Sequence, residues 1–60
     1  MPITIAVVKD GYGKKGGWKV LVNYIQRGIT YNSMQIANNQ AVEISENEHC
    51  DHLILAKEEL

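Results

Sequence analysis

The sequence predicts an α+β domain in which a small antiparallel four-stranded sheet is followed by one C-terminal helix. Two runs rich in β-branched residues flank a glycine-rich segment in the first half of the chain, and a helix-capping pattern lies near its end. A chain of 60 residues makes a single small domain, residues 1–60. Residues 33–45 also fit a helix, so the element order ββαβ is the alternative.

The first two strands are predicted on either side of a flexible hairpin tip. Residues 3–8 are rich in β-branched side chains and stop at Asp10-Gly11, which is a turn signal. Four of the seven residues in segment 11–17 are glycine, and their backbone entropy opposes regular structure. Residues 18–25 alternate as a second strand with apolar side chains on both faces. Gly28 suits a positive φ, and residues 29–31 begin a third extended segment.

Residues 33–45 are compatible with two structures. A hairpin would turn at Asn38-Asn39 and put four apolar side chains on one face: Met34, Ile36, Val42 and Ile44. A helix would be capped by Ser33 and would align four apolar side chains at helical spacing: Met34, Ala37, Ala41 and Ile44. The central asparagines favour the hairpin, because Asn forms turns readily and helices poorly.

The C-terminal helix is predicted to begin at the capping box Ser45-Glu46-Asn47-Glu48. Cys50, Leu53 and Ile54 would form its apolar stripe, although residues 53–55 also fit a strand. One helix covers one face of a sheet, and the first two strands are apolar on both faces. We therefore expect a homodimer that covers the second face; the alternative is a curled sheet whose second face is partly shielded by Trp18 and the tyrosines.

Composition and size exclude several classes of function. Cys50 is the only cysteine, so no disulfide forms within one chain, and a lone cysteine indicates a reducing, cytoplasmic location. No apolar run is long enough for a membrane helix. A domain this small has little room for a catalytic pocket, so we expect a non-enzymatic protein without a cofactor.

Two motifs lack the surroundings that their function requires. Residues 11–16 match the GxGxxG pattern of dinucleotide sites, but a strand rather than a helix is predicted to follow, so the phosphate would not meet a helix N-terminus. Residues 49–52, His-Cys-Asp-His, contain zinc-ligand types without a paired CxxC or a second ligand cluster. We therefore predict no metal site.

Charge is segregated along the chain. Residues 1–32 contain five Lys or Arg against one Asp, which gives +4, and residues 33–60 contain one Lys against six acids, which gives −5. All four aromatic residues lie in the basic half. Cations interleaved with aromatic rings are typical of single-stranded DNA or RNA binding, in which the glycine-rich loop would hold phosphates and Tyr12 or Tyr31 would stack a base. The predicted nucleic-acid-binding residues are Lys9, Tyr12, Lys14, Lys15, Lys19, Arg27 and Tyr31.

The acidic half supports a second hypothesis, a small protein-binding inhibitor or adaptor that blocks a larger host enzyme or nucleoprotein. Its candidate partner-binding residues are Glu46, Glu48, Asp51 and Glu58. The short, Asn-rich chain is similar in style to small bacteriophage proteins. In predicted element order it resembles the small nucleic-acid-binding domains of certain transcription cofactors, in which a four-stranded sheet precedes one helix. That resemblance implies a nucleic-acid partner and assigns no role to any residue.

Overall fold

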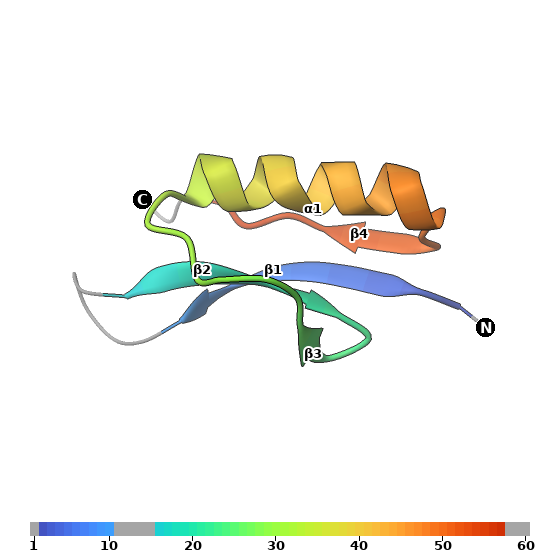
Figure 1. Ribbon diagram of the computed structural model, residues 1–60, viewed down its shortest axis with the longest axis horizontal. Coiled ribbons are helices and arrows are strands. Elements are labelled where there is room, and N and C mark those ends of the chain that lie inside the picture. The colour runs from blue at the N-terminus through green and yellow to red at the C-terminus, as the bar shows by residue number, and fades with distance from the viewer. Residues whose placement is uncertain (1, 11–15, 58–60) are drawn as a thin grey trace.

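A computed structural model describes residues 2–10 and 16–57 of the chain (Figure 1). Its elements in chain order are β1 (Thr4–Asp10), β2 (Gly17–Val22), β3 (Ile25–Gln26), α1 (Met34–Glu48) and β4 (His52–Ile54). The strands form one four-stranded sheet in the order β3-β2-β1-β4. The predicted α+β class with a four-stranded sheet and one helix is confirmed. The sheet is mixed rather than antiparallel, because β4 pairs parallel with β1, and the helix precedes the last strand as in the alternative order.

The two long strands form the predicted hairpin. β1 pairs antiparallel with β2 in a register that places Asp10 opposite Gly17. Gly17 therefore belongs to β2, although it was predicted in the hairpin tip. It is buried, and a Cβ atom there would lie 2.5 Å from the carbonyl oxygen of Tyr31. Only a residue without a side chain fits this close approach of two backbones.

The second strand ends earlier than predicted, at Val22, because Asn23 and Tyr24 both have positive φ angles, 50° and 71°. Two such residues match the type I′ turn that joins tightly paired strands. The Asn23 amide donates to the Thr4 carbonyl, and its side-chain oxygen accepts from the Thr4 amide, both at 2.9 Å. The turn is thereby anchored to β1. Gly28 has the predicted positive φ, at 83°.

The third strand is β3 rather than residues 29–31. β3 pairs with the end of β2 directly across the turn. Tyr31 instead makes an isolated antiparallel bridge with Trp18, in which each amide donates to the other residue's carbonyl, at 2.8 and 2.7 Å. The chain thus crosses back to the start of β2 before it enters α1.

Residues 34–48 form the helix α1, so the favoured hairpin at 33–45 is wrong. Ser33 caps the helix, and its hydroxyl accepts from the Ile36 amide at 3.4 Å. Ala37 and Ala41 are fully buried against the sheet, and such small side chains let a helix approach closely. The Asn38 side chain makes tertiary hydrogen bonds to Ala56, which offset the weak helix propensity of asparagine.

The capping box at Ser45 does not begin a helix. The Ser45 hydroxyl donates to the Val42 carbonyl at 2.7 Å, inside the last turns of α1. His49, in the left-handed conformation with φ of 52°, ends the helix, and its amide donates to the Ser45 carbonyl. The predicted C-terminal helix is therefore replaced by β4, which agrees within one residue with the alternative strand at 53–55.

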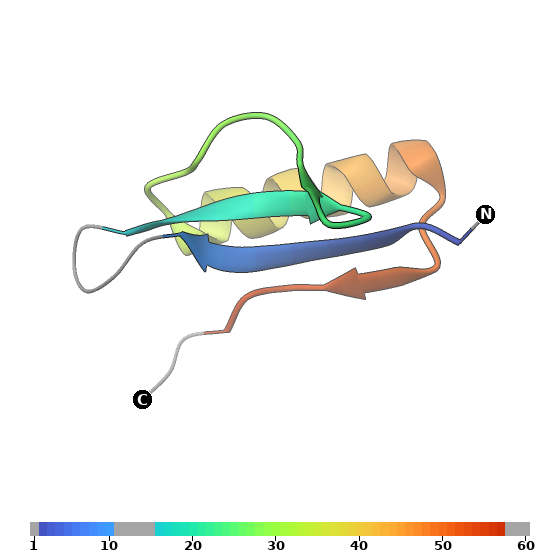
Figure 2. The same cartoon turned by 90° about the horizontal axis from the view of Figure 1, so that it is seen from below.

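The core lies between α1 and one face of the sheet. Its buried residues are Ile5, Val7, Val20, Val22, Ala37 and Ala41. Figure 2 shows the strands in front of α1, so the helix covers one face alone. Strand pairing puts Ala6, Leu21 and Ile54 side by side on the opposite face. Among the described residues, no helix has the length and apolar character that crossing a membrane requires.

Candidate binding surface

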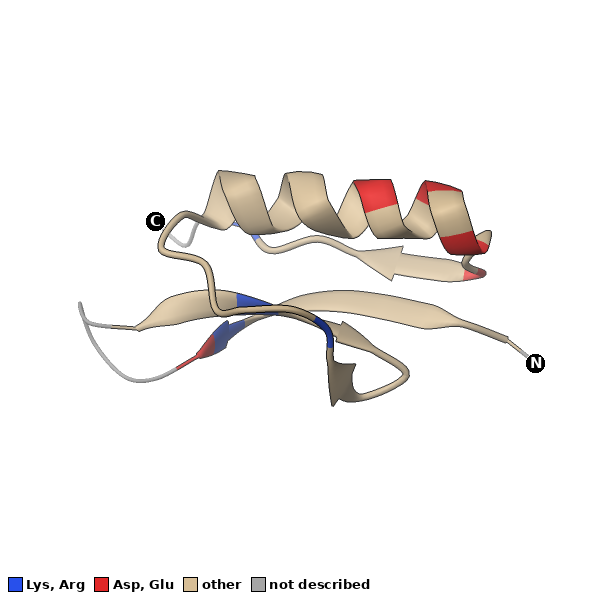
Figure 3. Ribbon diagram, viewed as in Figure 1, with Lys and Arg blue, Asp and Glu red and all other residues tan. Residues whose placement is uncertain are grey.

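The charge segregation of the sequence is only partly kept in space, because Asp10 lies at the basic end and Arg27 binds Glu48 in the last turn of α1. β1 ends where β2 and α1 begin, and α1 ends where β4 begins, at the opposite end of the molecule (Figure 1). Lys9 and Lys19 lie near the first end, and the acids of α1 lie toward its last turns (Figure 3). Lys57 follows Ala56, which Asn38 binds in the first half of α1. Lys57, the one cation of residues 33–60, therefore lies near the basic end.

Lys9 lies against the ring of Trp18. The two residues are direct partners across the β1–β2 pair, and the Lys9 ammonium is 4.4 Å from the ring centroid. Such a contact attracts the ammonium to the negative face of the indole. In the described part of the chain, no carboxylate forms an ion pair with Lys9.

Lys19 is partly neutralised. Its ammonium lies 3.7 Å from the Asp10 carboxylate, and the other oxygen of that carboxylate accepts from the Thr30 hydroxyl at 3.1 Å. Gln26 donates to the same hydroxyl at 3.3 Å. These polar groups link β1 to the segment after β3, on the face of the sheet that α1 leaves open.

Arg27 and Glu48 bind each other. The guanidinium donates to both carboxylate oxygens, at 3.2 and 3.5 Å, and so connects the segment after β3 to the last turn of α1. Each was predicted for a different function, Arg27 for nucleic acid and Glu48 for a protein partner. In this two-point contact, the guanidinium N–H groups that would bind a phosphate are already bound to the Glu48 carboxylate.

The other predicted site residues are distributed as follows. Tyr31 is half-buried and packs against the core beside Trp18, which is likewise half-buried and packed against it. The Asp51 carboxylate accepts from the Ile3 amide at 2.7 Å, and Glu46 is exposed on α1. Tyr12, Lys14, Lys15 and Glu58 lie outside the described residues. Within the described ranges, no three His, Cys, Asp or Glu side chains are grouped to bind a metal ion.

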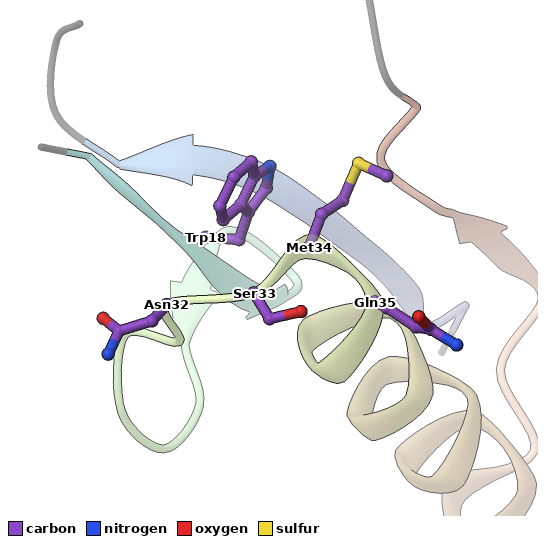
Figure 4. A pocket seen from close by; sticks show the side chains of 5 residues that line it. All are labelled: Trp18, Asn32, Ser33, Met34 and Gln35. Carbon is purple, nitrogen blue, oxygen red and sulfur yellow. The ribbon is translucent and has the colours of Figure 1, made fainter. Parts of the chain in front are cut away.

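An open hollow of about 430 Å³ lies beside Trp18, where the chain enters α1. It is lined by Trp18, Asn32, Ser33, Met34 and Gln35. Figure 4 shows that the side chains of Trp18 and Met34 extend to the same side of the chain, whereas those of Asn32 and Gln35 point away from this pair, in opposite directions. Sequence reasoning did not select these residues as a site, because they approach Trp18 only when a helix begins at residue 34.

Comparisons with known proteins give no relative for this chain: no protein-family model, curated protein or solved structure matches it.

Proposed function

We propose that the protein is a non-enzymatic module that binds single-stranded DNA or RNA at the end where β1 finishes and β2 and α1 begin. The observation that carries the proposal is the Lys9 ammonium against the Trp18 indole, without a carboxylate partner in the described residues, beside an open hollow. Proteins that bind single strands combine cations along the phosphate backbone with aromatic surfaces for the bases.

The ion pairs limit how strongly the surface binds. Arg27 is bound to Glu48 and Lys19 to Asp10, whereas Lys9 has no carboxylate partner among the described residues. Lys9 lies on the α1 side of the sheet and Lys19 on the open face, so a strand at the hollow meets Lys9, and each phosphate neutralised contributes about −0.7 to the logarithmic salt slope. We therefore expect affinity in the micromolar range and a weak salt dependence.

Fluorescence anisotropy of a labelled single strand tests the proposal. We expect Lys9→Gln to weaken binding several-fold. Arg27→Gln removes the same charge at a site already occupied by Glu48, and we expect it to leave the affinity within about twofold. No saturable binding at tens of micromolar, or an equal loss in both variants, would refute the proposal.

A protein partner is the second candidate function, and exposed apolar residues around β3 favour it. Tyr24, Ile25 and Ile29 are 89%, 73% and 68% exposed. Tyr24 also has a positive φ, which is strained for an aromatic residue. A partner with an apolar groove would cover these side chains, in an inhibitor or adaptor role. The surface differs from the predicted acidic one, in which Glu48 and Asp51 already have intramolecular partners.

A homodimer and a cytoplasmic location complete the proposal. The open sheet face presents Ala6, Val8, Leu21 and Ile54, and a second copy would cover it. Ile54→Lys should convert such a dimer to monomer in light scattering with the secondary structure unchanged, whereas a monomeric wild type contradicts this assembly. The unpaired thiol of Cys50 suits a reducing compartment.

A further inference from the structure

We infer that the hollow between Trp18 and Met34 holds one unpaired nucleobase, with Lys9 on an adjacent phosphate. This inference rests on the proposed function, to which it adds a base-binding site and a reason for preferring single strands. The site differs from the one that the sequence predicts, where a tyrosine of the basic half stacks the base.

The two larger walls of the hollow suit a flat aromatic ligand. The indole of Trp18 and the thioether of Met34 extend to the same side of the chain (Figure 4), and both groups contact aromatic rings favourably. The volume, about 430 Å³, falls within the range of roughly 300 to 1,000 Å³ found for small-molecule sites. One base occupies such a hollow only if it is unstacked from its neighbours, which single strands permit and duplexes oppose.

Two residues at the edge of the hollow, Asn32 and Gln35, carry side-chain amides that point away from Trp18 and Met34 (Figure 4). The side-chain amides of Asn32 and Gln35 each offer donors and an acceptor, and both residues are exposed. Among the described residues, no hydrogen bond uses either amide. Ser33 has a different role, because its hydroxyl already caps α1 through the Ile36 amide. Recognition of a base edge by Asn32 or Gln35 would therefore require the side chain to rotate toward the hollow.

Lys9 supplies the charge. Its ammonium is 4.4 Å from the ring that forms one wall of the hollow, a position from which it reaches a phosphate attached to the bound nucleotide. Phosphate binding by Lys9 and base binding by the hollow are thereby adjacent on a single nucleotide. The two contributions are separable, because an abasic strand retains the phosphates and lacks the bases.

The first test compares an oligothymidine of about ten nucleotides with an abasic strand of the same length, and follows Trp18 emission. Trp18 is the only tryptophan, so its fluorescence reports directly on the hollow. We expect the normal strand to quench this emission and to bind about tenfold more tightly than the abasic strand. Equal affinity for the two strands would overturn the base site, yet would leave phosphate-driven binding intact.

The second test uses variants that preserve the core. Met34→Ala removes one wall, and alanine maintains the helix. Ile36→Ala makes a similar truncation at an exposed residue of α1 that does not line the hollow. We expect a loss of about fivefold to tenfold for the first variant and none for the second. Equal affinities for both variants and wild type refute the base site alone, whereas no binding of any strand by wild type refutes the proposed function as well.

Discussion

Asn38 binds Ala56 through both ends of its side-chain amide. The amide nitrogen donates to the Ala56 carbonyl at 3.0 Å, and the amide oxygen accepts from the Ala56 amide at 2.9 Å. This pair of hydrogen bonds imitates one rung of a β-ladder. It attaches the segment after β4 to α1, where no backbone partner is provided by β1, since β1 and β4 pair only as far as Ile54.

Asn38→Ala should therefore destabilise the fold by about 2 kcal/mol, because a half-buried backbone amide and carbonyl both lose their partners. Asn39 is the matched control, since it is an exposed asparagine on the same helix. Asn39→Ala should stabilise slightly, by about 0.5 kcal/mol, through helix propensity. Urea unfolding followed by circular dichroism measures both changes. Equal effects of the two substitutions would show that the Ala56 contact contributes nothing.

Gly17→Ala should destabilise by about 2 to 3 kcal/mol. Its Cβ would lie 2.5 Å from the Tyr31 carbonyl oxygen and 2.8 Å from the Thr30 methyl carbon, so the bridge between Trp18 and Tyr31 must open. We expect this opening to change Trp18 emission and to lower the midpoint of thermal unfolding. A variant with wild-type stability would mean that the two backbones separate without cost.

Gly28 provides a contrast to Gly17. There a Cβ would meet only the Tyr31 hydroxyl, at 3.5 Å, but φ is +83°. Gly28→Ala should lose about 1 kcal/mol through backbone strain, and Gly28→Asn less, because asparagine tolerates positive φ. The order of the three thermal midpoints, with glycine highest and alanine lowest, is the measurable result. A steric cause would instead make the larger asparagine the worse substitution.

Arg27 and Glu48 should couple weakly. Their side chains are 51% and 33% exposed, so solvent screens the pair despite its two-point contact. A double-mutant cycle with Arg27→Ala and Glu48→Ala should give about 0.5 kcal/mol, and about 1 M NaCl should remove most of it. A coupling that persists in high salt would indicate a packing contribution of the Arg27 stem rather than an ion pair.

Tyr24→Gly should stabilise the protein by about 1 kcal/mol. Tyr24 has φ of 71° and contributes little packing, whereas Asn-Gly is the preferred pair for a type I′ turn. Thermal unfolding measures the gain. If the tyrosine is present for a partner, the more stable variant should lose that partner in a binding assay, while nucleic-acid affinity remains unchanged. A destabilised variant would contradict the strain assigned to this residue.

The sequence was informative where local pattern and tertiary structure agree. β-branched alternation located β1 and most of β2, since these strands form the core with Val7 and Val20. The prediction from local pattern failed at Asn38. This residue type favours turns, but Asn38 lies inside a helix and binds Ala56, 18 residues away. The Ser45 capping pattern was misleading, because Ser45 lies in the last turns of α1, which His49 ends, and no helix follows among the described residues.

The candidate surface was predictable only in part. Lys9 was selected from charge, and the structure brings it against Trp18 across the β1–β2 pair. The sequence gives no reason to remove Arg27 from the predicted nucleic-acid-binding residues, because its carboxylate partner Glu48 lies 21 residues away. The hollow was not predictable, since Asn32 and Gln35 belong to no motif and acquire a shared surface only when α1 is placed beside β2.

The parallel pairing of β1 with β4 sets the order in which the chain can assemble. The β1–β2 hairpin needs only local contacts, which form within roughly 1 to 10 μs. The other edge of β1 is completed by β4, whose His52 pairs with Thr4, 48 positions earlier in the chain. During synthesis at about 5 to 20 residues per second, β4 is therefore made on the order of seconds after β1. Until β4 pairs with it, the β1 edge of the hairpin has unpaired backbone groups, and strands of other chains can pair at such an edge.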